Sequence, residues 1–456
     1  MARKLIFPAV LVLGLIFSAL ASPQFTKPVC AATINVPNNY PSIQSAINAA
    51  SNDDTIFVAA GTYRESIVIN KPLTLIGQSA TLTIIDGGRE GNVVNVTANR
   101  VTISGFTIRN SSVVGYSGGK NNGVYSPTGN TALNITGNII TSNEVGLTLH
   151  SSGSVISNNQ IVGNKMGGMT LAAAKNNVVS QNQIIGSSAF GISMTMGSSN
   201  NTLRNNLMAV NKWNFGFHSP STLQDCFNDI DTSNTVNGKP IYYWVNQSNK
   251  TVPSDAGYVA LINCTKITVQ DLNLTNNAQG VRLDYTNSSS ILRNNISTCV
   301  DAIHGEYSNN NSISRNLAEN NQDGIFLLSS SNNVINKNTL ASNLEGIYFL
   351  RASNNQFYQN SILNNQKQAV SYDSQNSWDN GAVGNYWSNY TGTDADHNGI
   401  GDTPHVITEN NADRYPLMTS FDTPPTMPEL PSYLALPILM IGTLALGLIY
   451  RKKSNN

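Results

Sequence analysis

The stretch Gly324-Ile-Phe-Leu-Leu-Ser-Ser-Ser-Asn-Asn-Val-Ile-Asn-Lys-Asn338 contains every element of a repeat that runs through most of the chain. A small residue opens a short alternating segment, a Ser/Asn cluster follows, and a second alternating segment ends on asparagine. The small residue recurs at Gly280, Ala302, Gly324, Gly346 and Ala369, and earlier at Gly123, Gly146, Gly168, Gly191 and Gly216. The asparagine recurs at Asn294, Asn316, Asn338 and Asn360. The period is therefore about 22 residues.

A unit of this length, with short strands and polar corners, is too small to close a core of its own. Stacked units bury one continuous core and pair each strand with its copies above and below. Asparagines at one fixed corner can then form a hydrogen-bonded ladder. Leucine-rich repeats have a similar length but need several leucines per unit, which are absent here. The pattern predicts an all-β fold, a right-handed parallel β-helix solenoid with ~22-residue coils.

Composition supports this fold and excludes several classes of function. The 456 residues include 26 Lys+Arg and 26 Asp+Glu, only 11% are charged, and 65 are asparagine. A neutral chain lacks the basic surplus that nucleic-acid binding requires, so we expect no nucleic-acid partner. An apolar content of 40% argues against a disordered chain.

The repeat has a recognisable beginning and one interruption. The segment Tyr40–Ala50 predicts a short amphipathic helix, with Ile43, Ala46, Ile47 and Ala50 on the face that would cap the open core. Residues 219–256 lack the repeat and predict a lateral excursion or an irregular coil. The expected organisation is a signal peptide at 1–32, a cap and first coils at 33–120, coils at 121–218, the excursion at 219–256, coils at 257–376, a C-terminal cap at 377–418, a Pro-rich linker at 419–433, a membrane anchor at 434–450 and a cytoplasmic tail at 451–456.

Both termini predict a surface location. Arg3 and Lys4 precede the apolar run Leu5–Leu20, which is typical of a secretory signal, although an uncleaved anchor is the alternative. The apolar segment Leu434–Tyr450 precedes Arg451, Lys452 and Lys453, as expected of a transmembrane helix with a cytoplasmic tail. A buried hydrophobic helix is the alternative for that segment. We therefore expect the body of the protein on the extracellular face of the membrane.

Secretion fits two further features of the sequence. Six of the N-x-S/T triplets begin at Asn95, Asn134, Asn200, Asn246, Asn263 and Asn389, and predict a glycoprotein. Cys226 could pair with Cys264, which would leave Cys299 as an odd thiol.

Several stretches resemble a known family. Ile43-Gln-Ser-Ala-Ile, Asp54-Thr-Ile-Phe-Val and Gly61-Thr-Tyr resemble the start of many pectin-lyase-like β-helices. The repeats, together with Gly384-Asn-Tyr-Trp-Ser-Asn-Tyr and Tyr415-Pro-Leu417, resemble the NosD family, over about residues 34–418. The resemblance implies the β-helix fold, whereas its members include lyases, hydrolases, binding proteins and copper-maturation factors. The C-terminal arrangement resembles that of archaeal surface proteins, with Pro428-Glu429-Leu430 where some carry a Pro-Glu-Phe sorting signal.

A calcium loop is predicted near the C-terminus. Asp394, Asp396, Asn398, the carbonyl of Ile400 and Asp402 occupy the alternate positions that supply oxygen ligands in a calcium loop, with a turn glycine at Gly399. His405 stands where an EF-hand has its bidentate Glu, so this is not an EF-hand. A shorter structural Ca²⁺ turn, or Asx turns without metal, are the two interpretations.

Aligned coils predict a polar and aromatic surface on the later repeats. One outward column contains Arg282, His304, Phe326 and Tyr348, and the next contains Asp284 and Glu306. Equivalent residues in stacked coils lie ~4.8 Å apart, so Asp284 and Glu306 should be neighbours with one raised pKa. Rings of this kind offer flat faces to a sugar. The corresponding columns in the earlier repeats contain no acids.

Three functions follow for these residues. The preferred one is binding of polysaccharide or envelope components by Arg282, Asp284, His304, Glu306, Phe326 and Tyr348. The second is a polysaccharide lyase or glycosidase that acts through Asp284, Glu306 and His304. The third is a structural or adhesive surface protein, in which these columns form only a solvated strand face.

Copper handling has the least support. Five of the nine methionines fall between Met166 and Met208, but Met169 and Met194 occupy inward positions and are interpreted as core residues.

Overall fold

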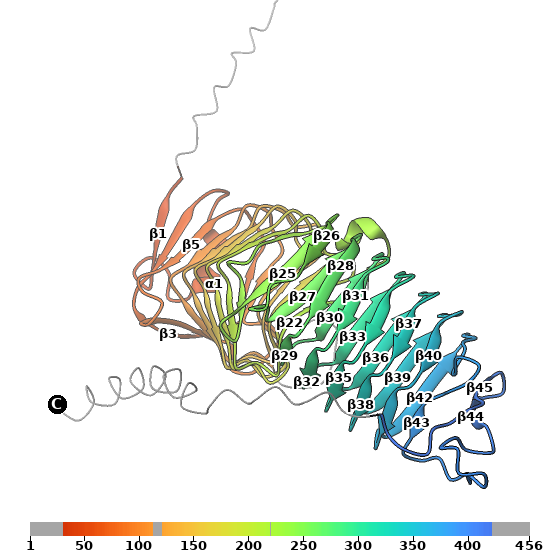
Figure 1. Cartoon of the computed structure of the whole chain (residues 1–456). Helices are drawn as coiled ribbons and strands as arrows, with labels where there is room; N and C mark the ends of the chain where they lie inside the picture. Colours follow the sequence, from red (N-terminus) through yellow and green to blue (C-terminus); the bar gives the residue numbers. More distant parts are fainter. Residues whose placement is uncertain (1–30, 113–120, 219, 422–456) are drawn as a thin grey trace, which may run out of the picture.

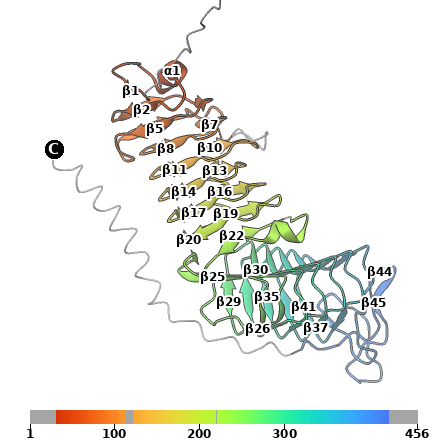
Figure 2. The same cartoon turned by 90° about the horizontal axis from the view of Figure 1, so that it is seen from above.

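The computed structural model describes residues 31–112, 121–218 and 220–421, and these residues form a parallel β-helix with two arms (Figure 1). We call the described residues up to 238 the first arm and residues 239–421 the second arm. Figure 2 shows the first arm running from α1 (Ile43–Ala49) to β22, and the second arm leaving it at an angle. Residues 1–30 of the predicted signal peptide at 1–32 lie outside the described residues, as do residues 422–433 of the predicted linker, the predicted anchor at 434–450 and the predicted tail at 451–456.

Two sheets belong to the first arm alone. The nine-stranded sheet contains β1 (Thr33–Val36), β2 (Thr55–Val58), β5 (Thr74–Gly77), β8 (Thr102–Ser104), β11 (Asn134–Thr136), β14 (Val155–Ser157), β17 (Val178–Ser180), β20 (Thr202–Arg204) and β23 (Asp229–Ile230). The seven-stranded sheet contains β4 (Ile67–Ile69), β7 (Val94–Val96), β10 (Asn122–Ser126), β13 (Val145–Leu149), β16 (Gly167–Ala172), β19 (Phe190–Thr195) and β22 (Trp213–Phe217).

One fifteen-stranded sheet runs through both arms. Its first-arm strands are β3 (Gly61–Arg64), β6 (Thr83–Asp86), β9 (Thr107–Arg109), β12 (Ile139–Thr141), β15 (Gln160–Val162), β18 (Gln183–Ile185), β21 (Leu207–Ala209) and β24 (Thr235–Val236). Its second-arm strands are β25 (Lys239–Val245), β27 (Tyr258–Ile262), β30 (Gln279–Asp284), β33 (Asp301–Glu306), β36 (Asp323–Leu328), β39 (Glu345–Leu350) and β42 (Lys367–Tyr372).

Two six-stranded sheets and a hairpin complete the second arm. One sheet contains β26 (Ser248–Thr251), β28 (Thr265–Gln270), β31 (Ser290–Leu292), β34 (Ser312–Ser314), β37 (Val334–Asn336) and β40 (Gln356–Tyr358). The other contains β29 (Asn273–Thr275), β32 (Asn295–Ser297), β35 (Leu317–Glu319), β38 (Thr339–Ala341), β41 (Ser361–Leu363) and β43 (Tyr386–Trp387). The hairpin consists of β44 (His405–Thr408) and β45 (Asn411–Asp413).

The predicted asparagine ladder is present and buried. The Asn316 side chain donates to the Ile291 carbonyl and to Asn338 Oδ1, both at 2.9 Å, and its own Oδ1 accepts the backbone amide of Asn294. The column continues to Asn360. Each amide therefore satisfies backbone groups at the corner of its own coil and of its neighbours, which is why one residue type recurs there.

The small-residue column is explained by close approach of neighbouring coils. A Cβ placed on Gly324 would lie 2.5 Å from the Gly346 carbonyl oxygen, and one on Gly346 would lie 2.6 Å from that of Gln368. At these two glycines a side chain would not fit without moving the backbone, although the column accepts alanine at Ala302 and Ala369. The alternation of exposed and buried positions is interrupted here, since the residues before and after both glycines are buried.

The N-terminal helix caps the core as predicted. Ile43, Ala46 and Ile47 of α1 are fully buried and Ala50 is nearly so. Ser42 and Ser45 form a capping box, and the Glu65 carboxylate accepts the amides of Ile43 and Gln44. The first turn of the helix therefore has its free amides satisfied.

The interruption at 219–256 is the joint between the arms. After the short 3₁₀ helix Leu223–Cys226, β24 pairs with β25 in antiparallel fashion, whereas every other described pair in the fifteen-stranded sheet is parallel. Strand β27 is buried on both faces. Tyr258, Ala260 and Ile262 belong to the first-arm core, and Val259 and Leu261 to the second-arm core. The first-arm core therefore packs against one face of the fifteen-stranded sheet, and the second-arm core packs against the other face.

Candidate functional site

The structure confirms the predicted alignment of the second-arm columns. Arg282 is paired in register with His304, His304 with Phe326, and Phe326 with Tyr348. Asp284 is likewise aligned with Glu306. The period read from the sequence therefore identifies neighbouring residues correctly.

Part of this predicted surface is buried and not exposed to solvent. Arg282 is 1% exposed, Asp284 is 0% exposed and Glu306 is 6% exposed. Strand β30 continues the face of β27 that points into the first-arm core, because Ala260 is aligned with Arg282 and Ile262 with Asp284. These side chains point away from the second-arm core, but the first arm covers them. The expected groove for a sugar does not exist at Arg282 and Asp284, and the interpretation as a solvated face is also wrong there.

The buried residues form an ion cluster that closes the end of the first arm. Arg282 Nε lies 2.7 Å from Asp284 Oδ2, and Arg282 Nη2 lies 3.0 Å from Glu306 Oε2. Arg282 Nη1 donates to the Phe217 carbonyl at 2.8 Å, and its guanidinium lies over the Phe217 ring. Burial raises the pKa of Asp284 against the opposing effect of Arg282. We assign this cluster a structural role, since the first arm covers Arg282 and Asp284 at its centre.

Histidine side chains flank the cluster on both arms. His304 Nδ1 lies 2.7 Å from Asp301 Oδ2, and its Nε2 lies 3.8 Å from Glu306 Oε2. His218, at the end of β22, lies 3.4 Å from the Gln279 amide nitrogen. Burial, with a contribution from Arg282, lowers the pKa of His218 to about 4, so this ring is neutral near neutral pH. His304, one of the predicted residues, therefore lies between the buried ion cluster and the residues of the following coils.

A column of carboxylates that the sequence analysis did not single out lies beside His304. Asp301, Asp323 and Glu345 are aligned in register at the starts of β33, β36 and β39. They directly precede the small residues Ala302, Gly324 and Gly346. Strict alternation holds only after the small residue, and the predicted columns begin there. Asp301 and His304 share a face although they are three positions apart, since His304 Nδ1 lies 2.7 Å from Asp301 Oδ2.

The outer members of this column have cationic partners, and the central member has none. Asp301 is bonded to His304, and Glu345 Oε1 lies 2.8 Å from Lys367 Nζ. No Lys, Arg or His among the described residues lies within ion-pair distance of Asp323. Burial, together with the charges of Asp301 and Glu345, raises the pKa of Asp323 to about 7. A carboxylic acid that gives up its proton near neutral pH is suited to acid–base chemistry.

An aromatic ladder runs parallel to the carboxylates. The His304 and Phe326 rings are stacked with centroids 4.6 Å apart, and the Phe326 and Tyr348 rings are stacked at 5.1 Å. Phe326 and Tyr348 are half-buried, so one part of each ring faces solvent. We call the ladder His304, Phe326 and Tyr348, together with Asp301, Asp323 and Glu345, the second-arm face.

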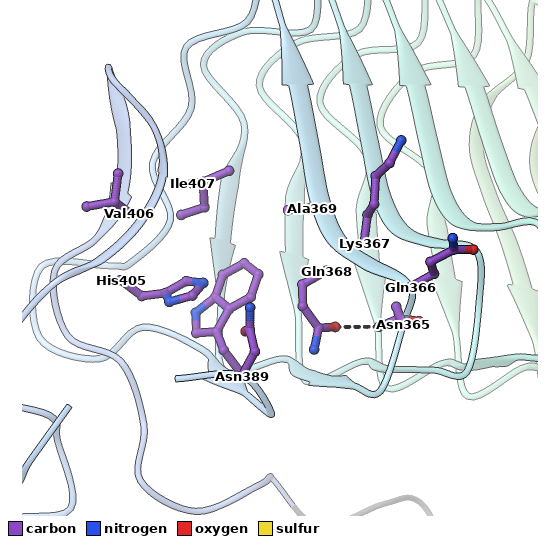
Figure 3. Close-up of a pocket in the computed structure, with 10 residues that line it drawn as sticks. Asn365, Gln366, Lys367, Gln368, Ala369, Asn389, His405, Val406 and Ile407 are labelled. Carbon is purple, nitrogen blue, oxygen red and sulfur yellow. Dashed lines mark hydrogen bonds between the residues drawn. The ribbon is translucent and has the colours of Figure 1, made fainter. Parts of the chain in front are cut away.

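Two hollows lie near the second-arm face: one is lined by Gln322 and Leu344, which precede Asp323 and Glu345, and the other by Lys367 on the next coil. A cleft of about 280 Å³ lies at the joint, where Lys212 and Trp213 of the first arm oppose Gln322 and Leu344 of the second. A pocket of about 380 Å³ lies at the far end, between Lys367 at the start of β42 and the β44 residues His405 and Val406 (Figure 3). Figure 3 also shows the Gln368 side chain, which accepts a hydrogen bond from Asn365 at 2.9 Å.

The predicted calcium loop is folded as a set of Asx turns. The Asp394 carboxylate accepts the backbone amides of Asn398 and Gly399, and Asn398 Oδ1 accepts that of Ile400. Asp402 Oδ2 accepts the amide of Ala395. Within the described ranges, no group of three or more His, Cys, Asp and Glu side chains is arranged to hold a metal ion. Calcium binding at Asp394, Asp396, Asn398, Ile400 and Asp402 therefore stays a prediction.

Two further expectations concern cysteines and the membrane. Cys226, Cys264 and Cys299 are all buried free thiols, so the possible Cys226–Cys264 bond is not formed. In residues 31–112, 121–218 and 220–421, the structure contains no helix with the length and apolarity needed to span a membrane.

The strand pairing, the asparagine ladder and the continuous core define the class of the protein as a parallel β-helix. Residues 228–392 match the family model described as "Periplasmic copper-binding protein (NosD)", and residues 92–255 match the one described as "Right handed beta helix region". Residues 92–392 thus match the NosD-like, pectin-lyase-like family of right-handed parallel β-helices.

Solved structures of low identity are also similar. The A-module of the mannuronan C-5 epimerase AlgE6 from Azotobacter vinelandii is 14% identical with a TM-score of 0.39, over 74% of this chain and 93% of that chain. A pectin methylesterase from Aspergillus niger is 14% identical with a TM-score of 0.33, over 56% of this chain and 81% of that chain. The catalytic domain of a GH87 alpha-1,3-glucanase is 12% identical with a TM-score of 0.38, over 77% of this chain and 69% of that chain. No curated protein sequence matches the chain.

The described residues do not provide a suitable set of ligands for the copper named in the family description. Met169 and Met194 are fully buried in the first-arm core, as predicted. Met208 is also buried there, whereas Met166 and Met196 are exposed. His304 is engaged with Asp301, and His405 is stacked on Trp387. We therefore derive no chemistry from copper.

Proposed function

We propose that the second-arm face binds a glycan. The single observation that supports this function is the half-buried Phe326–Tyr348 stack beside the carboxylates of Asp301, Asp323 and Glu345, which are 7%, 7% and 9% exposed. Stacked rings accept the apolar face of a pyranose, and carboxylates accept hydrogen bonds from its hydroxyl groups. Only His304, Phe326 and Tyr348 of the residues predicted from sequence contribute to this surface.

The charge of the second-arm face limits the kind of glycan. Three carboxylates lie in one column, and of the nearby cations Lys367 is bound to Glu345 and Arg282 is buried in the ion cluster. An anionic polymer would be repelled by this arrangement, whereas a neutral or amine-bearing glycan would not. We therefore propose a neutral or amino-sugar ligand.

Affinity electrophoresis of the intact protein tests this function. Gels are cast with hydroxyethyl cellulose as the neutral polymer, glycol chitosan as the amine-bearing one and polygalacturonate as the anionic one. We expect retardation by one of the first two, and its loss in Phe326→Ala and Tyr348→Ala. Tyr125→Ala, on the corresponding column of the first arm, is the matched control and should bind like the wild type. Retardation unaffected by either ladder variant would contradict the proposed site.

A second candidate function, hydrolysis of the bound glycan, is favoured by the Asp301–Asp323 pair. The two carboxyl groups lie one coil apart, which suits a retaining mechanism. A protonated Asp323 would donate to the glycosidic oxygen while Asp301 attacks the anomeric carbon, and Asp323 would then take a proton from the water that releases the sugar from Asp301. The raised pKa of Asp323, about 7, supports this assignment. Polymer loss in the same gels, abolished in Asp323→Asn without loss of retardation, would support it. Intact polymer after prolonged incubation would contradict it.

The cellular location of the protein and its calcium binding are proposed from the sequence alone. We propose that the body lies outside the cell, secreted by the segment 1–32 and held by the anchor at 434–450, and that the loop at 394–402 binds Ca²⁺ with a structural role. Protease treatment of intact cells should degrade the body, and calcium should raise the melting temperature of the wild type but not of Asp394→Asn. A protease-resistant body, or no response to calcium, would contradict the respective proposals.

A further inference from the structure

The second-arm face is bounded on the side of the joint. Exposure falls along the ladder from the half-buried Tyr348 and Phe326 to His304, which is 9% exposed, and Arg282, which is 1% exposed. Arg282 lies beneath Phe217, the last residue of β22. A ligand that follows the rings toward the first arm therefore meets a wall after His304.

The first arm also closes the corner from which the carboxylates project. The Asn214 amide donates to the Asn276 carbonyl at 2.6 Å, and the Ala278 amide donates to the Phe215 carbonyl at 2.9 Å. Strand β22 thus lies on the coil that precedes Asp301. Trp213 projects over the next corners, because it lines the same cleft as Asn320, Gln322 and Leu344. Gln322 and Leu344 directly precede Asp323 and Glu345 in the chain.

The opposite end is closed by the C-terminal cap. In Figure 3, His405, Val406 and Ile407 of β44 lie across the pocket from Lys367, Gln368 and Ala369. Lys367 is the next member of the carboxylate column after Glu345 and is bonded to it. His405 is held in place by stacking on the buried Trp387 ring, with centroids 4.7 Å apart. The column of polar residues therefore ends at a second wall, whereas the rings continue from Tyr348 to Tyr372, which is 56% exposed.

We propose that the second-arm face takes a short oligosaccharide or the end of a glycan chain, and excludes the interior of a long polymer. This inference rests on the proposed glycan binding and goes beyond it by fixing the length of the ligand. Between the walls lie only the coils that carry Asp301, Asp323, Glu345 and Lys367, stacked ~4.8 Å apart. That spacing is close to the length of one sugar unit in an extended chain. A chain aligned with the arm would place a few units on the rings and meet Trp213 or His405 at its end.

The test is the stoichiometry of binding by the intact wild-type protein. The probes are cello-oligosaccharides and chito-oligosaccharides of increasing length, followed by long hydroxyethyl cellulose and glycol chitosan chains of known molar mass. Isothermal titration gives the affinity per chain, and sedimentation equilibrium gives the number of protein molecules on each chain. We expect affinity to rise with length over the first few units and then to level off. The number of protein molecules per chain should stay independent of length.

A variant at the wall sharpens the test. Trp213→Phe, which preserves a ring against Phe190, should fold, and we expect it to bind short oligosaccharides about tenfold more weakly. Trp244→Phe, at an aromatic position outside the second-arm face, is the matched control and should bind like the wild type. The wild-type stoichiometry provides a test even if Trp213→Phe is unstable.

Failure of the length inference can be told apart from failure of the proposed function. A number of bound protein molecules that grows in proportion to chain length would overturn the inference and leave glycan binding intact. No binding to any probe would overturn the proposed function, and the inference with it.

Discussion

The two arms share one repeat but differ on their outer faces. Both have a buried asparagine ladder, illustrated by Asn182 in the first arm and Asn316 in the second, each with the same three donated hydrogen bonds. The column that contains Phe326 and Tyr348 in the second arm corresponds to Thr148, Thr170 and Ser193 in the first. Stacking requires the inward and corner residues, and leaves the outward residues free to carry a binding surface.

The largest effect should come from breaking the contact between the arms at Arg282. Arg282→Ala removes the cation between two buried carboxylates and leaves Asp284 without its charged partner. We expect a loss of about 3–5 kcal/mol in the free energy of unfolding. Denaturant unfolding, followed by tryptophan fluorescence, measures the loss.

An exposed ion pair of the same arm is the control for Arg282. Arg293 pairs with Asp271 at 2.7 Å, but both side chains are more than two-fifths exposed. Arg293→Ala should lower the free energy of unfolding much less than Arg282→Ala does, because solvent screens an exposed ion pair. Equal losses in the two variants would show that the buried cluster does not hold the arms together.

The asparagine ladder should contribute equally to the two arms. Asn182→Ala and Asn316→Ala each leave buried backbone carbonyls and amides of neighbouring coils without partners. We expect each to lower the free energy of unfolding by about 1–3 kcal/mol. Thermal unfolding of the two variants side by side measures the costs. A large cost in one arm and none in the other would contradict a shared role.

The smallest effect should come from the carboxylate column, and it should depend on pH. The pKa of Asp323 is raised from 3.8 to about 7, so the folded protein binds this proton more tightly than the unfolded chain does. Wild-type stability should therefore fall as pH rises through this window. Asp323→Asn removes that dependence and should be about 1 kcal/mol more stable than the wild type at pH 8.

The comparison for Asp323 is made at two pH values by calorimetry. At a pH below 4 the carboxylic acid and the amide are both neutral, and the two proteins should melt at similar temperatures. Thr170→Ala, on the outer face of the first arm, retains Asp323, so its difference in stability from the wild type should not change with pH. An Asp323→Asn protein that is less stable than the wild type at pH 8 would contradict the assigned pKa shift.

Much of the fold could be predicted from the period of the sequence. Coils of equal length must stack in register, so counting 22 residues from His304 gives Phe326 and then Tyr348. The capping helix was predictable because Ile43, Ala46 and Ile47 follow the helical period. Both inferences depend only on spacing within one element or between identical ones.

The environment of the site could not be predicted in the same way. Residues 219–256 do not repeat, so the period does not reveal that the first arm covers Arg282 and Asp284. One signal was present: Tyr258-Val-Ala-Leu-Ile262 is apolar at every position, which is typical of a strand buried on both faces. The carboxylates of Asp301 and Asp323 were missed because the alternation on which the columns were counted is interrupted at the small residue.

The joint also has a consequence for solubility. The terminal strand of a β-solenoid exposes a row of unpaired backbone groups, and such an edge can recruit a second copy of the chain. In this protein β22 donates and accepts hydrogen bonds with residues 276–278, and β24 turns back onto β25. The end of the first arm is thus paired within the same molecule. Mutations that open the joint should for that reason promote aggregation before they unfold either arm.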